Sequence, residues 1–344
     1  MSEAKEIQIS QHEYGASVDE AYAEYPEAWK PEPEPKLNTA IIQRNGSKIT
    51  NLHNLPEPLV RAVTRHPHDR IEGRISVSEL VQPPQLRKLT IDHRDEIVED
   101  AADRIWSLLG TLLHGVLERN ARGLKDTVAE EELTTEVLGW TVVGHYDLSE
   151  MVLEGEWLTD WKLTSIWAIK DGIKPEWEQQ LNCYAELIRR AGRPVNQLQI
   201  VAVGRDWSKS KARYDPSYPQ QQVKVFAVPL WSPEQAADYV EQRVRLHQEA
   251  EKGNYGDCTA DERWARQDQW AVMKKGQKRA VRLYDTEASA VRHVGDDKTL
   301  TIVPRPGESV RCESYCPVNK WCLQYARMKA AEPKKAMAGL KVAS

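Results

Sequence analysis

The sequence predicts an α/β fold from the order of its periodic segments. A helix comes first, an antiparallel hairpin of two alternating strands follows, and a second helix, two further strands and a third helix complete the order. At 344 residues the chain is long enough to bury a sizeable core. Its net charge of −5 does not by itself indicate a nucleic-acid-binding protein, although local patches matter more than the total.

The first helix is expected over residues 98–122, with an apolar stripe at helical spacing. The stripe consists of Ile105, Leu108, Leu109, Leu112 and Val116. His114 and Glu118 are four residues apart, so they are neighbours on the side opposite the stripe. They form either a solvated pair or part of a metal site.

The hairpin carries the side chains that most clearly indicate a catalytic or metal-binding site. Alternating apolar runs lead into Asp147 on the first strand and into Asp160 and Lys162 on the second, and Gly155 suits the turn between them. Folding about that turn places Asp147 opposite Asp160 and Lys162, which share one face of their strand. Two carboxylates and an ammonium group suit a site for Mg²⁺ or Mn²⁺, with the lysine assisting an attacking water. A cross-strand salt bridge is the alternative interpretation.

The second helix begins at Pro175 and ends before Gly192. Gln180 and Tyr184 lie four apart on it and can both face the hairpin, while Cys183 is expected to be a buried packing thiol. Strands are expected over 197–203 and 222–228, with a basic loop between them. The third helix has a capping box that starts at Ser232, and it is closed by Gly253.

These motifs resemble the PD-(D/E)XK nuclease superfamily, and within it the RecB-like exonuclease branch, over roughly residues 75–325. The resemblance rests on Gly144-x-x-Asp147, Asp160-x-Lys162 and Gln180-x-x-x-Tyr184. It implies a restriction-endonuclease-like core, with a central mixed sheet flanked by helices. It also implies Mg²⁺- or Mn²⁺-dependent hydrolysis of DNA phosphodiester bonds at free ends. The implied catalytic residues are Asp147, Asp160, Lys162, Gln180 and Tyr184, and the implied metal ligands are His114, Asp147, Asp160 and the carbonyl of Trp161.

A second metal centre is predicted from cysteine spacing. Cys312, Cys316 and Cys322 follow a C-x3-C-x5-C pattern, and Cys258 would be the fourth ligand. The set is similar to the iron–sulfur clasp of AddB-type nucleases and of the CRISPR-adaptation nuclease, which implies a 4Fe-4S cluster. The pattern departs from those families because Cys258 follows the nuclease motifs and because the triplet does not start with C-x2-C. A structural Zn²⁺ is the alternative metal, and Cys183 is the alternative ligand.

Four segments are expected along the chain. Residues 1–38 read as a disordered acidic arm that could dock a protein partner, and residues 39–253 as the nuclease core. Residues 254–325 would be the cysteine module, and residues 326–344 a flexible basic tail. The module contains a basic hairpin turning at Gly276, either a solvated edge or a contact to the DNA backbone, with Trp264 or Trp270 available to stack on bases.

DNA, single- or double-stranded, is the expected partner. We expect a cytoplasmic protein with no membrane contact, because no apolar run approaches membrane-spanning length. A catalytically silent DNA-binding or scaffold protein that keeps the cluster is the rival interpretation. A non-nuclease metalloenzyme using His114 and Glu118 is a third. Recombination, repair, phage DNA processing and CRISPR adaptation all remain open as pathways.

Overall fold

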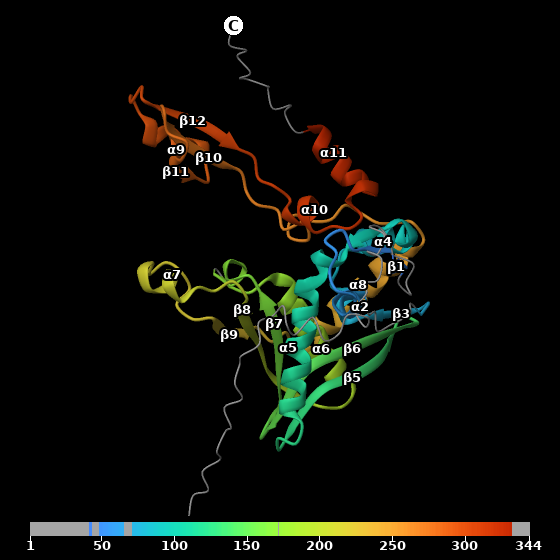
Figure 1. Cartoon of the computed structure of the whole chain (residues 1–344). Helices are drawn as coiled ribbons and strands as arrows, with labels where there is room; N and C mark the ends of the chain where they lie inside the picture. Colours follow the sequence, from blue (N-terminus) through green and yellow to red (C-terminus); the bar gives the residue numbers. More distant parts are fainter. Residues whose placement is uncertain (1–40, 43–47, 65–70, 171, 332–344) are drawn as a thin grey trace, which may run out of the picture.

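The structure is a computed structural model that describes residues 41–42, 48–64, 71–170 and 172–331, and its architecture is mixed α/β. The central element is a six-stranded mixed sheet with the order β3-β6-β7-β8-β9, to which β5 adds by pairing with β6 (Figure 1). Its strands are β3 (Arg74–Ser76), β5 (Thr127–Val137), β6 (Trp140–Val152), β7 (Gly155–Thr164), β8 (Val195–Gly204) and β9 (Val223–Val228). Helices flank this sheet, as expected from the sequence.

The predicted hairpin is confirmed as β6 and β7, which are joined by a two-residue turn between Val152 and Gly155. Gly155 has φ +145°, and a Cβ there would lie 2.8 Å from the carbonyl oxygen of Pro194. Only glycine therefore fits this position without displacing the neighbouring backbone. The expected strands after the second helix are confirmed as β8, parallel to β7, and β9, antiparallel to β8.

The strands β6 and β7 separate at the two aspartates of the hairpin. Their ladder ends at Leu148 opposite Thr159, so the next facing pair would be Asp147 and Asp160. Beyond this point β7 continues alongside β8 as far as Thr164. Both carboxylates therefore lie where the sheet divides.

The expected start of the first helix is wrong. Residues Val98–Asp100 form strand β4, which pairs in parallel with β2 (Lys48–Thr50). The carboxylate of Asp100 accepts hydrogen bonds from the backbone N–H groups of Leu52 and Ala102, which ends the strand and begins a short 3-10 turn. The α-helix itself, α5, spans Ile105–Ala121.

The apolar stripe of α5 is buried only at its start. Ile105 and Leu108 contact the small cluster that includes Ile49 and Val60. Leu109, Leu112 and Val116 are instead 38–54% exposed. The helix turns the side that carries His114 toward the sheet, contacting β5, β6 and β7, so polar contacts rather than the stripe decide its orientation.

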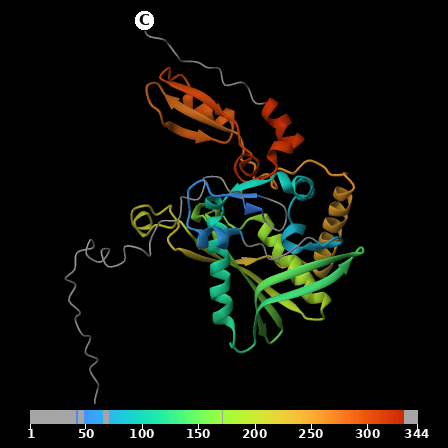
Figure 2. The ribbon, with the colours of Figure 1, turned by 45° about the vertical axis from the view of Figure 1, so that its right-hand side comes forward.

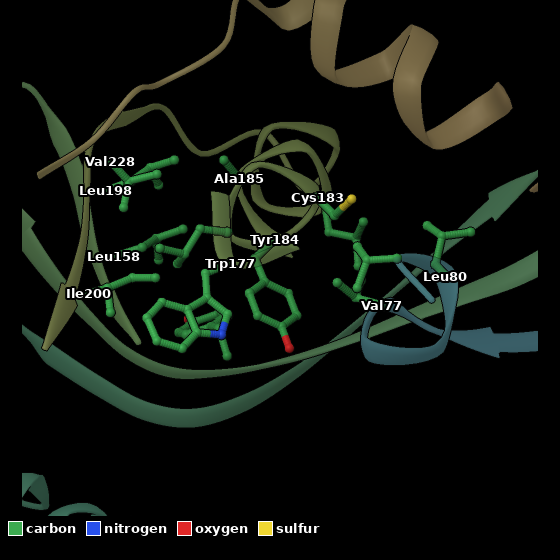
Figure 3. Packing of buried hydrophobic residues seen from close by; sticks show 14 of the residues in the cluster. Val77, Leu80, Leu158, Trp177, Cys183, Tyr184, Ala185, Leu198, Ile200 and Val228 are labelled. Carbon is green, nitrogen blue, oxygen red and sulfur yellow. The ribbon is translucent and has the colours of Figure 1, made fainter. Parts of the chain in front are cut away.

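The main core lies between α6 (Pro175–Arg190) and the sheet, as Figure 3 shows. Trp177, Leu181, Tyr184, Ala185 and Ile188 are all buried on the face that α6 turns toward this core. Cys183 is fully buried as expected, and burial raises the pKa of its thiol to about 12. The third helix, α8 (Pro233–Glu251), packs on α6 and has the predicted capping box at Ser232.

The segment expected as a basic loop is the short helix α7 (Lys209–Tyr214). The hydroxyl of Ser208 accepts a hydrogen bond from the backbone N–H of Lys211 and so caps its first turn. The other elements before the cysteine module are β1 (Ile41–Ile42), α2 (Glu57–Thr64), α3 (Val77–Leu80), α4 (Pro84–Asp92), η1 (Arg94–Glu96), η2 (Ala101–Arg104) and η3 (Ile166–Ile169).

The C-terminal part forms a separate three-stranded sheet, which stands apart from the central sheet in Figures 1 and 2. The hairpin predicted at Gly276 is confirmed, and a third strand that the sequence analysis did not predict pairs with it. The elements are β10 (Gln269–Lys274), β11 (Ala280–Tyr284), α9 (Glu287–Val294), β12 (Leu300–Arg305), α10 (Val310–Ser314), η4 (Asn319–Trp321) and α11 (Leu323–Ala331).

Two of the expected segments fall at the ends of the described chain. Residues 326–331 belong to α11, so the flexible tail expected to begin at 326 is wrong for that stretch. The predicted arm, 1–38, and residues 332–344 lie outside the described residues. Among the helices in the described ranges, none has the length and apolar character needed to cross a membrane.

Candidate metal centre and cysteine cavity

Three side chains from different elements converge beside the point where the sheet divides. His114 comes from α5, Glu130 from β5 and Asp147 from β6, and one potential ligand atom of each lies within 4.8 Å of the other two. Nδ1 of His114 is 3.1 Å from Oδ1 of Asp147 and 3.7 Å from Oε1 of Glu130. This imidazole and two carboxylates could bind a metal ion.

The backbone of Glu130 has an unusual, left-handed conformation. In the β5–β6 ladder, Ala129 pairs with Leu148 and Glu131 with Tyr146, so the register is unbroken and Glu130 lies opposite Asp147. Its φ is +54°, a left-handed conformation that costs a residue with a Cβ roughly 1–2 kcal/mol. The carboxylate lies near His114 and also 3.4 Å from Nε2 of His145.

The electrostatics of this group favour a proton or a cation. Hydrogen bonds to Asp147 and Glu130 raise the pKa of His114 to about 10, while burial acts in the opposite direction. The imidazole must lose that proton before it can bind a metal, so metal binding at this group would release a proton.

A second set of polar side chains connects β7 to α6. Nζ of Lys162 lies 2.7 Å from Oδ2 of Asp160 and donates a hydrogen bond of 3.0 Å to Oε1 of Gln180. Nε2 of Gln180 in turn donates to the hydroxyl of Tyr184 at 2.8 Å. The shared face of Asp160 and Lys162 is therefore as expected, and Gln180 and Tyr184 reach the hairpin as expected.

Asp147 and Asp160 lie in different environments. Oδ2 of Asp147 accepts a hydrogen bond of 2.7 Å from the backbone N–H of Trp161, at the place where the β6–β7 ladder stops. Burial raises the pKa of Asp160 to about 6, opposed by Lys162 and reinforced by Asp147. Within the described residues, the buried Oδ2 of Asp160 makes its ion pair but no aligned hydrogen bond, so it retains acceptor capacity.

The structure brings His114 and Asp147 together and adds Glu130, which the sequence analysis missed. Glu130 is followed by Glu131 and Glu132 in a strand, and nothing in that run singles it out. The signal is its place opposite Asp147, and it arises from strand pairing. Glu118, the other candidate on α5, instead forms an ion pair with Arg122 one turn later.

The four predicted cysteine ligands line one cavity, although Cys258 precedes the other three by 54 or more residues. Cys258 is clamped by Gln324, which accepts from its backbone N–H at 2.9 Å and donates to its carbonyl at 2.8 Å. Its thiol donates to Oε1 of the buried Gln85 on α4, at 3.2 Å. Burial raises the pKa of the Cys258 thiol to about 12. Cys183 lies in the main core, away from this cavity.

The cysteine module is held against the rest of the chain by apolar and cationic contacts. Cys316 and Cys322 contact a cluster formed by Leu89, Ile97 and Val318. Trp264 is enclosed, because Nζ of Lys174 lies 4.8 Å from its ring centre and the guanidinium of Arg311 lies 4.9 Å from it. Its indole N–H also donates to Glu176 at the start of α6. A base that stacks on Trp264 would have to compete with these two cations for its ring.

The fold and the two sites define a mixed α/β protein with a candidate metal centre at its central sheet. No protein-family model matches the chain, and no curated protein matches its sequence.

Two solved structures are similar to part of the chain. The structure of SSO0001 has 17% sequence identity and a TM-score of 0.40, over 55% of this chain and 85% of the other. A protein of Eubacterium rectale described as a "Putative exonuclease" has 13% identity and a TM-score of 0.28, over 56% of this chain and 72% of the other. At these TM-scores neither likeness carries an argument about function.

Proposed function

We propose that this chain is a metal-dependent deoxyribonuclease that hydrolyses DNA phosphodiester bonds. The observation that carries the proposal is the convergence of His114, Glu130 and Asp147 next to the Asp160–Lys162 pair. A hard cation beside a lysine and a buried carboxylate is the chemistry that phosphodiester hydrolysis requires. The motifs that resemble the PD-(D/E)XK superfamily supply Asp147, Asp160, Lys162, Gln180 and Tyr184 as the catalytic set.

The donor set fits Mg²⁺ or Mn²⁺. Carboxylate oxygens are preferred by both ions, and an imidazole is acceptable to Mn²⁺. The ligands would be His114, Glu130 and Asp147, with Asp160 and the carbonyl of Trp161 available to complete the site. When bound, such an ion polarises a phosphoryl oxygen and makes a water more acidic.

The residues around the ligands then have separable roles. Lys162 lies at the edge of the site, where its ammonium can orient the attacking water or stabilise charge on the phosphate. Gln180 fixes the ammonium by accepting one of its hydrogens, and Tyr184 fixes Gln180. The substitution Gln180→Leu should therefore weaken catalysis through the position of Lys162 and leave metal affinity nearly unchanged.

The four cysteines fit an iron–sulfur cluster better than a zinc ion. In a tetrahedral zinc site the sulfurs lie about 3.8 Å apart, given a Zn–S bond of about 2.3 Å. Among the described residues, no three cysteine sulfurs lie within 4.8 Å of one another. A 4Fe-4S cluster spans a wider set of sulfurs, so we propose that cofactor, with a structural role at the junction of module and core.

Attack on free ends, which would make the enzyme an exonuclease, is proposed from the RecB-like resemblance alone. DNA recombination, repair, phage DNA processing and CRISPR adaptation are the settings this activity would suit. The second candidate function is a catalytically silent DNA-binding or scaffold protein, which the intact Asp147, Asp160 and Lys162 set disfavours.

The proposal is tested by titrating Mn²⁺ into wild type and Asp147→Asn by calorimetry and assaying digestion of linear DNA in parallel. We expect one site of measurable affinity in the wild type, and loss of both binding and digestion in the variant. Digestion that survives in Asp147→Asn would overturn the assignment of this site. The substitution removes the charge but keeps the shape and one oxygen acceptor for the Trp161 N–H, so unfolding is a smaller risk than with alanine.

A further inference from the structure

An aromatic hollow lies between η3 and α7, which follow β7 and β8 in the chain. It has a volume of about 450 Å³ and is lined by Trp167, Tyr214, Tyr218 and Lys211, together with Ser210 and Asp215. Trp167 is 51% exposed and Tyr214 is 80% exposed, so their ring faces are accessible to a ligand. Hollows of this size and aromatic lining are typical of ligand-binding sites.

The hollow is a built feature of the fold. Tyr218 is buried, its hydroxyl accepts a hydrogen bond from the backbone N–H of Ser208, and its ring meets Trp167 edge to face at 5.4 Å. The loop that carries Trp167 is fixed by Asp206, which accepts from the hydroxyl of Ser165 at 2.8 Å and from the N–H of Ile166 at 2.7 Å. These contacts hold the aromatic rings in place before any ligand arrives.

Part of the lining of the hollow follows directly after β7, the strand that carries Asp160 and Lys162. Trp167 follows Lys162 by five residues, at the end of β7. Arg205 lies at the same end of the sheet, where its N–H donates to the carbonyl of Thr164. Its guanidinium stacks on Trp106 at 4.3 Å, and Trp106 is 51% exposed and precedes His114 on α5 by about two turns. An exposed tryptophan stacked on a cation therefore lies near the end of β7 from which the chain continues to Trp167.

The charge of this surface is complementary to a polyanion. Lys170 lies 5.8 Å from the ring centre of Trp167, and Lys211 lies 5.9 Å from that of Tyr218. Lys174 is close enough to Arg205 and Lys162 for both cations to lower its pKa, although burial has the larger effect. The acid in the lining, Asp215, accepts hydrogen bonds from the backbone N–H and hydroxyl of Ser217.

We propose that this hollow is a stacking subsite for unpaired bases of single-stranded DNA, with Trp106 and Arg205 carrying the strand between it and the metal centre. This inference deepens the proposed nuclease function and rests on it. Bases in a duplex stack on one another, so their faces cannot reach Trp167 or Tyr214, whereas unpaired bases can. Interleaved cations and aromatic rings are how sequence-tolerant proteins bind a single strand.

The test measures binding of fluorescently labelled oligo-dT and of a duplex of the same length by anisotropy, with Ca²⁺ in place of Mg²⁺ to suppress cleavage. The variants are Trp167→Ala and Tyr214→Ala. The matched control is Trp157→Ala, because Trp157 is 38% exposed at the opposite end of β7. Far-ultraviolet circular dichroism verifies that each variant is folded. Because Tyr214 is more exposed than Trp167, its substitution disturbs the fold less, so Tyr214→Ala still tests the hollow if Trp167→Ala misfolds.

Wild type should bind oligo-dT more tightly than duplex. Each of the two variants should weaken oligo-dT binding about tenfold or more, as loss of one stacked base does, and the control should not. Equal or tighter duplex binding by the wild type, or unchanged oligo-dT binding in both folded variants, would overturn the inference. If the wild type digests DNA with Mn²⁺ but both variants bind oligo-dT as tightly as the wild type does, the stacking subsite is refuted and the proposed nuclease function stands. If it neither binds nor digests DNA, the proposed function fails as well.

Discussion

Replacing Glu130 by glycine and by alanine should separate the strain of its backbone from the use of its carboxylate. At φ +54°, alanine retains a penalty of roughly 1–2 kcal/mol, which glycine avoids, while glycine loses roughly 0.5–1 kcal/mol more chain entropy on folding. Without metal, Glu130→Gly should therefore be more stable to unfolding than Glu130→Ala by about 1 kcal/mol. Both variants lack the carboxylate, so both should bind Mn²⁺ equally weakly.

The assay is urea denaturation in EDTA, with Mn²⁺ titration by calorimetry in a parallel experiment. The matched control is Glu132, two residues further along β5 and paired with His145 in the regular ladder, where glycine should be less stable than alanine. If alanine equals or exceeds glycine in stability at position 130, the backbone of Glu130 is not strained as described. Wild-type affinity for Mn²⁺ in both variants would show that Glu130 is not a ligand.

Three further predictions concern the core, a buried histidine and the cysteines. Gly144→Ala should cost about 1–3 kcal/mol in urea, because its Cβ would lie 2.7 Å from a methyl of Leu187, whereas Gly110→Ala has open space and should be neutral or stabilising. Burial lowers the pKa of His247 to about 4, so its stabilising contribution is complete above about pH 6.5. As the pH falls toward 4, up to about 3 kcal/mol should be lost, and His247→Gln should flatten that decline in urea midpoints. Cys258→Ser should abolish the visible absorption and iron content of anaerobically purified protein and lower its thermal midpoint, and unchanged iron content would contradict the ligand set.

Local patterns predicted the elements whose structure is decided locally. The alternation on both sides of Gly155 is enough to specify the hairpin, and the proline start and glycine stop are enough to bound α6. The capping box at Ser232 is likewise a local signal. These elements also place Asp160, Lys162 and Gln180 in reach of one another, so that part of the candidate site followed from the sequence.

Features that depend on pairing between distant segments could not be predicted in the same way. Val98–Asp100 looks helical in isolation, but it pairs with Lys48–Thr50, about 50 residues earlier. Glu130 becomes a candidate ligand only because the register between β5 and β6 puts it opposite Asp147. The exposure of Leu112 on α5 follows from the same cause, because contacts of His114 with the sheet set the rotation of that helix.

The central claim is tested most directly by digestion of end-labelled linear and circular DNA with Mg²⁺ or Mn²⁺. Wild type and Asp160→Ala, both purified anaerobically, are compared. The account predicts that the wild type shortens linear DNA, leaves circular DNA intact and requires the metal, and that the substitution abolishes the activity. Absence of cleavage by the wild type across metals and substrates, or full activity of Asp160→Ala, would contradict it.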